Sequence, residues 1–304
     1  MTSGGPSPLT MGRRTRRADD MSMSTPRRST VTLDSLPALH RSVQDGSLEL
    51  LYQPEIDLAT GAIVAMEGLL RWHHESLGML PPPAFLGLAD VSGEIIPIGE
   101  WVLRAGAAEA RRWASIPGPT RRLWLNVSGA ELVAEGFVDL VADVVSSHGL
   151  ADGALGLEVP ETVVVGLGAS ATPLLRELGE AGVALAIDDF SSFYATLGAI
   201  EVLPIDAVKL AHRYVRGVGE LVGPDGSGDP LVSAVIEQAH ARGLYVVAEG
   251  VETWGEAARL IELGCDRAHG WLFESAQRAD KARWLLEHGK GWPPRHVPTP
   301  RTEA

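Results

Sequence analysis

The sequence predicts an α/β fold in which parallel strands close into a TIM-like (β/α)8 barrel with an irregular, antiparallel first strand. Two observations lead to this prediction. From Leu48 onward, short apolar runs typical of strands alternate with amphipathic stretches typical of helices. Six of the runs end on a residue that could hold or serve a metal ion. A closed parallel barrel would bring those residues together, because the carboxyl ends of its strands meet at one rim.

The first two strands depart from the parallel pattern. Residues 48–58 and 63–72 are joined by only four residues, too short a link for a crossover helix, and this predicts an antiparallel hairpin.

Residues 217–230, rich in Gly and Pro, predict a mobile loop. Amphipathic helices are predicted over residues 101–113, 173–181, 231–242 and 253–263.

The chain divides into one barrel domain and two tails. Residues 1–30 are rich in Arg, Ser and Pro and lack an apolar period, which predicts a disordered tail with alternative starts at Met11, Met21 and Met23. Residues 31–290 form the predicted barrel domain. Residues 291–304 are expected to be a flexible C-terminal tail.

Composition narrows the class of protein. A chain of 304 residues with 45% hydrophobic content can bury a large core. Its net charge of −13 argues against binding polymeric nucleic acid. No apolar run approaches the ~20 residues of a membrane span, so a cytoplasmic protein is expected. The single cysteine, Cys265, cannot form an internal disulfide and is expected to be buried.

The polar residues that follow the apolar runs suggest a metal site. Five carboxylates gathered at one rim would repel one another unless cations lay between them, and Mg²⁺ or Mn²⁺ would bind such oxygen ligands. Any single acid among them could equally be a solvated strand end or a helix cap. The residues are Glu67, Asn126, Glu158, Asp188, Asp189, Lys209 and Glu249.

These residues lie within motifs that resemble the EAL domain family, metal-dependent phosphodiesterases that linearise the bacterial second messenger cyclic di-GMP. The resemblance spans roughly residues 48–273. The motifs include Leu51-Tyr52-Gln53-Pro54, Glu67-Gly68-Leu69-Leu70-Arg71-Trp72, Asn126-Val127-Ser128, Glu158-Val159-Pro160-Glu161, Asp188-Asp189-Phe190, and the run Ala248-Glu249-Gly250-Val251-Glu252-Thr253.

The resemblance implies a role for each residue. Glu67, Asn126, Glu158 and Asp188 would hold one Mg²⁺ or Mn²⁺, and Asp188 would bridge to a second ion held by Asp189 and Glu249. Lys209 would orient or help deprotonate the attacking water. Catalysis is accordingly assigned to Lys209, Glu67, Asp188 and Asp189. Substrate contacts are assigned to Gln53, Leu69, Arg71, Glu252 and His269.

The resemblance also implies an activity and partners. Opening one phosphodiester bond of cyclic di-GMP would give linear pGpG, because two hard cations can activate a shared water and neutralise the phosphodiester oxygens. The protein is expected to act as a homodimer in bacterial signal transduction, under the control of dimerisation, of metal and substrate supply, or of a separate regulatory protein.

Departures from the family pattern cluster where catalysis is controlled. Residues 191–196 lack both glycines of the usual loop, although its expected anchor, Glu161, is retained. Ala211 replaces an aspartate near the second metal, and His269 replaces a glutamine. Changes around metal ligands typically cost 10 to 100-fold in affinity or activity, which favours a slow enzyme over a dead one.

Other functions are compatible with these departures. A catalytically impaired domain could serve as a cyclic di-GMP receptor or as a protein-interaction module. A barrel dehydratase acting on sugar acids also places acidic ligands at strand ends, but adjacent Asp188 and Asp189 and the amide of Asn126 suit a two-metal phosphodiester site better.

Overall fold

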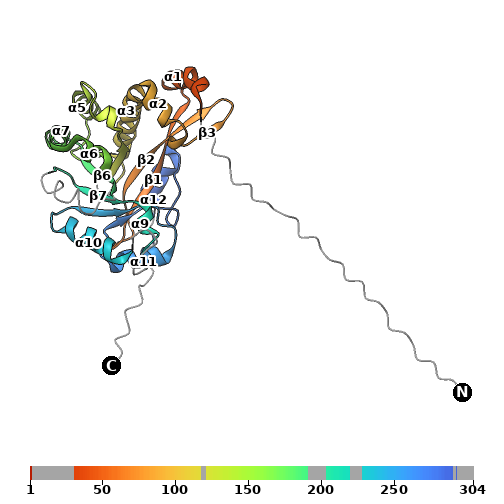
Figure 1. The fold of residues 1–304 in the computed structure, drawn as a ribbon, viewed down its shortest axis with the longest axis vertical. Coiled ribbons are helices and arrows are strands. Elements are labelled where there is room, and N and C mark those ends of the chain that lie inside the picture. Colours follow the sequence, from red (N-terminus) through yellow and green to blue (C-terminus); the bar gives the residue numbers. More distant parts are fainter. Residues whose placement is uncertain (2–30, 118–120, 191–202, 220–227, 290–291, 293–304) are drawn as a thin grey trace.

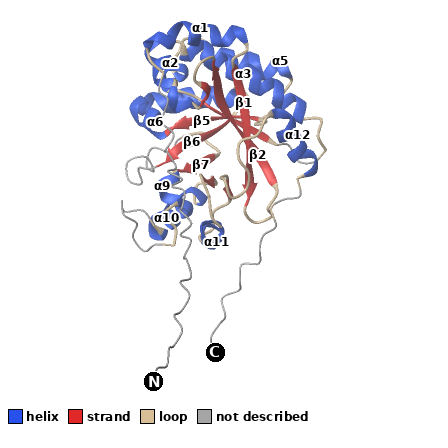
Figure 2. Ribbon diagram, turned by 90° about the vertical axis from the view of Figure 1, so that its right-hand side faces the viewer, coloured by secondary structure: helices blue, strands red, loops and turns tan. Residues whose placement is uncertain are grey.

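The computed structural model describes residues 1, 31–117, 121–190, 203–219, 228–289 and 292, which form a barrel of strands with helices on the outside (Figures 1 and 2). The strands pair in the order β1-β9-β8-β7-β6-β5-β4-β2, and β2 pairs with β1 to close the ring. The strands of the ring are β1 (Leu48–Asp57), β2 (Ile63–His74), β4 (Arg122–Asn126), β5 (Leu155–Pro160), β6 (Ala184–Phe190), β7 (Ala207–Leu210), β8 (Tyr245–Ala248) and β9 (Arg267–Ala268).

The predicted barrel with an antiparallel first strand is confirmed. β1 runs antiparallel to both β2 and β9, whereas the pairs from β2–β4 through β8–β9 are all parallel. Strand β3 (Gly78–Leu80) extends the hairpin beyond the ring by pairing with the end of β2.

Helices follow the strands as the sequence predicts, with shifted ends. α3 begins at Ile95, six residues before the predicted helix. Pro97 does not prevent this earlier start, because it lies in the first turn, where a missing N–H is tolerated. Helix α11 begins after Thr253, whose side chain caps it. Among the described residues, the α-helices are α1 (Leu36–Asp45), α2 (Leu86–Ser92), α3 (Ile95–Trp113), α4 (Gly129–Leu132), α5 (Phe137–His148), α6 (Glu161–Leu167), α7 (Ala171–Glu180), α9 (His212–Val215), α10 (Asp229–His240), α11 (Trp254–Glu262) and α12 (Ala279–His288).

Several predictions concern residues outside the described ranges. Residues 2–30 and most of 291–304 are among them, as is the central part of the predicted loop, 220–227. Trp292 is described, and its ring lies 5.5 Å from that of Trp254 and 5.7 Å from that of Phe273. Within the described ranges, none of the helices combines the length and apolar character that a membrane span requires.

Trp124 packs among residues with small side chains in the sheet. It is 1% exposed and clusters with four alanines contributed by other strands, Ala65, Ala184, Ala186 and Ala207. Gly156 on neighbouring β5 pairs with it directly, and a Cβ added there would lie 2.2 Å from a ring carbon of Trp124. The indole therefore requires glycine at position 156.

Gly156→Ala is expected to destabilise the barrel by about 1–3 kcal/mol, the usual cost of overpacking a close-packed core. Urea unfolding followed by circular dichroism would measure the change. Gly179→Ala is the matched control, because this glycine lies in α7 with nothing within 4 Å of the added methyl. The control should be neutral or slightly stabilising, and equal effects of the two substitutions would contradict the packing argument.

Candidate functional site

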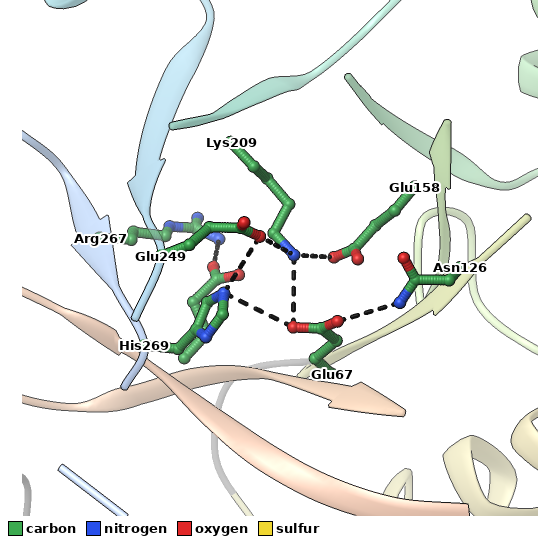
Figure 3. A network of polar contacts seen from close by, with 8 residues as sticks. Glu67, Asn126, Glu158, Lys209, Glu249, Arg267 and His269 are labelled. Carbon is green, nitrogen blue, oxygen red and sulfur yellow. Dashed lines mark hydrogen bonds and ion pairs between the residues drawn. The ribbon is translucent and has the colours of Figure 1, made fainter. Parts of the chain in front are cut away.

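The polar groups that the sequence places on different strands meet around one lysine. Lys209 in β7 is 1% exposed. Its Nζ lies 2.7 Å from Glu158 Oε1, 2.9 Å from Glu249 Oε1 and 3.3 Å from Glu67 Oε2 (Figure 3). The three acids come from β5, from the residue directly after β8 and from β2. The barrel therefore gathers residues that lie as much as 182 positions apart in the chain.

Glu67 does not end its strand, as its place after an apolar run suggested, whereas the predicted strand over residues 63–72 is confirmed. β2 continues from Glu67 to His74, because residues 68–72 go on pairing with β1 and residues 72–74 pair with β3. Asn126 does end its strand, and Glu249 directly follows β8. Glu67 thus reaches the site from the middle of a long strand.

Asn126 and His269 flank Glu67. The amide Nδ2 of Asn126 donates a hydrogen bond to Glu67 Oε1 at 3.0 Å. His269 Nε2 lies 3.5 Å from Glu67 Oε2 and 3.4 Å from Glu249 Oε1. One ligand atom each from Glu67, Glu249 and His269 lie within 4.8 Å of one another, a spacing suited to a metal ion.

The acids of this site outnumber the cations that face them. Burial raises the pKa of Asp188 to about 7, and the charges of Glu249 and Glu67 add to it against the opposing effect of Lys209. Burial and the charge of Glu67 raise the pKa of Glu158 well above its ordinary value, again against Lys209. Asp188 Oδ1 is buried without a hydrogen-bond partner among the described residues. An additional cation would relieve both carboxylates.

The pKa values of Glu67 and Glu249 are shifted downward. Burial disfavours their charged forms, but Lys209 and His269 outweigh it, so the pKa of each is lower than usual. Burial also works against the charge of Lys209, yet the surrounding carboxylates raise its pKa well above the ordinary value. At neutral pH the site therefore holds ionised Glu67 and Glu249 beside an ammonium.

Asp189 occupies a different environment from Asp188. It is exposed, and its φ of 55° is the one positive value outside glycine in the described ranges. The pairing of β6 with β7 shifts register around it, between Ile187 and Phe190. No described contact joins its carboxylate to the cluster around Lys209, and its role as a metal ligand stays a prediction.

A cavity of about 550 Å³ opens beside Glu67 and Asn126. Two of the predicted substrate contacts, Leu69 and Arg71, line it. Gln53 does not: it is buried in β1 opposite Glu67, and its Nε2 donates to the carbonyl oxygen of Glu274 at 3.0 Å. Glu252 is exposed just after β8.

The rest of the cavity wall was not predicted from the sequence. It is formed by Pro81, Pro82 and Pro83 together with residues of α2, α3 and α4, including buried Glu131. Glu131 and Ser128 form a capping box at the start of α4, with Glu131 Oε2 accepting from the Ser128 amide at 2.8 Å. The Ser-x-x-Glu spacing was visible in the sequence, but it signals a helix start rather than a ligand site.

The structure describes Ala211 and Glu161 but not the altered loop that Glu161 is expected to anchor. Ala211 is 1% exposed and directly follows β7, so this position adds no charge to the site. Glu161 is 2% exposed at the start of α6. Residues 191–196, which it is expected to anchor, lie outside the described residues, and that role also stays a prediction.

The chain is similar to several known proteins. The EAL domain family matches residues 37–276. The chain is 37% identical to the uncharacterized protein Rv1354c of Mycobacterium tuberculosis, over 92% of this chain and 44% of that protein. It is 35% identical to the cyclic di-GMP phosphodiesterase NbdA of Pseudomonas aeruginosa, over 81% of this chain and 31% of that protein. The chain thus spans less than half the length of these relatives.

A solved structure supports the same relationship. The PaMucR phosphodiesterase, determined as a complex with c-di-GMP, superposes with a TM-score of 0.77 and 30% sequence identity. The superposition covers 82% of this chain and 100% of that one. With the family matched across most of the chain and the barrel reproduced in a solved relative, this protein belongs to the EAL domain family.

Proposed function

We propose that this chain is a metal-dependent phosphodiesterase that hydrolyses cyclic di-GMP to linear pGpG in bacterial second-messenger signalling. The observation that carries the proposal is the convergence of Glu67, Glu158 and Glu249 on buried Lys209, directly beside the cavity. The names of NbdA and PaMucR, which associate them with phosphodiesterase activity and c-di-GMP, support it.

The donor set fits a hard divalent cation. Glu67, Asn126, Glu158, Asp188, Asp189 and Glu249 are the residues we expect to hold one or two Mg²⁺ or Mn²⁺ ions, which bind carboxylate and amide oxygens. The raised pKa of Asp188 and its unpartnered Oδ1 are consistent with a missing positive charge. When bound, such ions would lower the pKa of water and neutralise charge on the phosphodiester.

The other side chains have separate tasks in this proposal. Lys209 contacts three carboxylates with an ammonium that has three N–H groups. One of these groups could orient a water where a carboxylate binds a metal ion instead of Lys209. Leu69 and the apolar wall of the cavity would cover a flat purine base, and the Arg71 guanidinium would face a phosphate. Gln53, whose amide is engaged with Glu274, would act by supporting the strand that carries Glu67.

Incubation of the purified protein with cyclic di-GMP and Mn²⁺ or Mg²⁺, with chromatography of the products, tests the proposal. We expect pGpG to form, to be lost when EDTA removes the metal, and to return when Mn²⁺ is added in excess. Thermal unfolding in EDTA is the control that separates metal loss from unfolding. If no pGpG forms at any concentration of either ion, the hydrolase proposal fails.

A second candidate function is a cyclic di-GMP receptor with impaired catalysis. The observation that favours it is buried Ala211, which leaves the end of β7 without the aspartate that the family places there. A receptor would bind cyclic di-GMP in the same cavity and return it unchanged. Calorimetric titration that detects binding, together with intact nucleotide after long incubation, would select this function.

Ala211→Asp should raise the rate of hydrolysis about 10-fold at limiting Mn²⁺, within the range that residues supporting metal ligands contribute. Position 211 is the N-cap of α9, where its backbone is not helical, with φ of −53° and ψ of 138°, and aspartate is a favoured N-cap residue. Ala211→Asn is the matched control, because it has the same shape and capping ability without the charge. Equal rates for the two variants would show that the missing carboxylate does not limit activity.

We further propose that the protein acts as a homodimer in the cytoplasm and that a separate protein can regulate it. The net charge of −13 supports a partner other than polymeric nucleic acid. Sedimentation with and without cyclic di-GMP would test the dimer, since a monomer under both conditions contradicts it.

A further inference from the structure

His269 and Lys209 face the same pair of carboxylate oxygens. Glu249 Oε1 lies 2.9 Å from Lys209 Nζ and 3.4 Å from His269 Nε2. Glu67 Oε2 lies 3.3 Å from Lys209 Nζ and 3.5 Å from His269 Nε2. His269 directly follows β9, and Figure 3 shows its imidazole directed into the group on the side away from Glu158. The imidazole nitrogen is therefore part of the site rather than of the surrounding core.

The distances around Nε2 suit a shared ion better than hydrogen bonds. Good N–H···O bonds span about 2.7–3.2 Å, and both contacts of His269 Nε2 are longer. Two ligands each ~2.1 Å from one metal ion, at angles between 90° and 109°, lie roughly 3.0–3.4 Å apart. The contacts at 3.4 and 3.5 Å need only a small adjustment to meet this spacing.

A second observation points to a cation in addition to Lys209. Glu158 is 0% exposed, and its Oε2 has no hydrogen-bond partner among the described residues, although its Oε1 faces Lys209. A fully buried carboxylate oxygen without a partner is costly. Glu158, which shares Lys209 with Glu67 and Glu249, thus has unused capacity to interact with positive charge.

We propose that His269 Nε2 is a metal ligand, together with Glu67 and Glu249, and that it shifts the preference of this site from Mg²⁺ toward transition metal ions. Imidazole nitrogen suits Zn²⁺, Fe²⁺, Co²⁺ and Ni²⁺, whereas Mg²⁺ prefers oxygen. The inference deepens the proposed function, since the same site would carry hydrolysis. Metal binding itself requires no nucleotide.

The test measures metal affinity in the full chain without cyclic di-GMP. Co²⁺, Zn²⁺ and Mg²⁺ would each be titrated calorimetrically into the wild-type protein, His269→Gln and His240→Gln. Gln retains a polar side chain but replaces the imidazole with an amide. His240 is the matched control, because this histidine of α10 pairs with Asp266 at 2.8 Å instead of facing the site.

We expect His269→Gln to weaken Co²⁺ and Zn²⁺ binding at least ~10-fold and to change Mg²⁺ binding no more than ~2-fold, since Mg²⁺ gains little from nitrogen. His240→Gln should resemble the wild type. Unchanged Co²⁺ and Zn²⁺ affinities in His269→Gln would overturn the inference.

Pulsed electron paramagnetic resonance gives a readout on the wild-type protein alone. Mn²⁺ bound at the site should show coupling to a directly ligated ¹⁴N nucleus, and its absence would overturn the inference even if the variant failed to fold. The two proposals can fail separately. Nitrogen coupling without pGpG formation would remove only the hydrolase function, whereas pGpG formation without nitrogen coupling would remove only the role of His269.

Discussion

Glu67→Gln is expected to reduce pGpG formation at least ~100-fold, which corresponds to about 2.7 kcal/mol of transition-state stabilisation. The substitution keeps the shape of the side chain and its contact with Asn126, but it removes the negative charge that faces Lys209 and His269. A neutral amide binds a divalent cation more weakly than a carboxylate. Initial rates at saturating cyclic di-GMP and Mn²⁺ would measure the effect.

The control for this prediction is Glu100→Gln, which removes the same charge from an exposed position on α3, where Glu100 pairs with Arg104. It should leave the rate unchanged. If Glu67→Gln keeps a rate within a few-fold of the control, Glu67 neither binds the catalytic cation nor positions the reacting groups.

Lys209→Met is expected to lower the free energy of unfolding by about 3 kcal/mol in EDTA, because removing one partner leaves buried charges uncompensated. Lys209 is the ammonium between Glu67, Glu158 and Glu249, and without it these carboxylates repel one another. Mn²⁺ should restore much of the stability, since binding to the folded state stabilises it. Urea unfolding with and without Mn²⁺ would measure both effects.

Lys281→Met is the matched control for the lysine substitution. Lys281 is exposed on α12 and lies over the ring of Trp284, so its loss should change stability by well under 1 kcal/mol, as is usual at the surface. Equal stability of Lys209→Met and the control in EDTA would contradict the role of Lys209 as the internal counter-ion of the site.

Much of the barrel could be predicted because its signals are local. Four residues between the first two apolar runs exclude a crossover, and the structure has the expected hairpin between β1 and β2. The gathering of Glu67, Glu158 and Glu249 around Lys209 follows from the closure of the barrel, which alternating strands and helices also predict.

What the sequence left open depends on contacts between distant segments. An apolar residue of α3 such as Ile98 has the same pattern whether it packs in a core or lines a cavity, so this part of the cavity wall was not predicted. The extension of β2 beyond the predicted end at Trp72 depends on pairing with β3, a strand of three residues with little signal of its own. For His269, a distance to two carboxylates was needed before a metal could be considered.

The long strand β2 spaces three of the candidate site residues at regular intervals. Glu67, Leu69 and Arg71 occupy alternate positions of this one strand, so their side chains share a face at intervals of about 6.8 Å. Its pairing with β1 fixes that face, with Gln53 opposite Glu67 and Glu49 opposite Arg71. A one-residue slip would turn all three away together. If the proposed function holds, the hairpin that interrupts the regular barrel therefore also sets the distance between the metal ligand Glu67 and the side chains that would hold cyclic di-GMP.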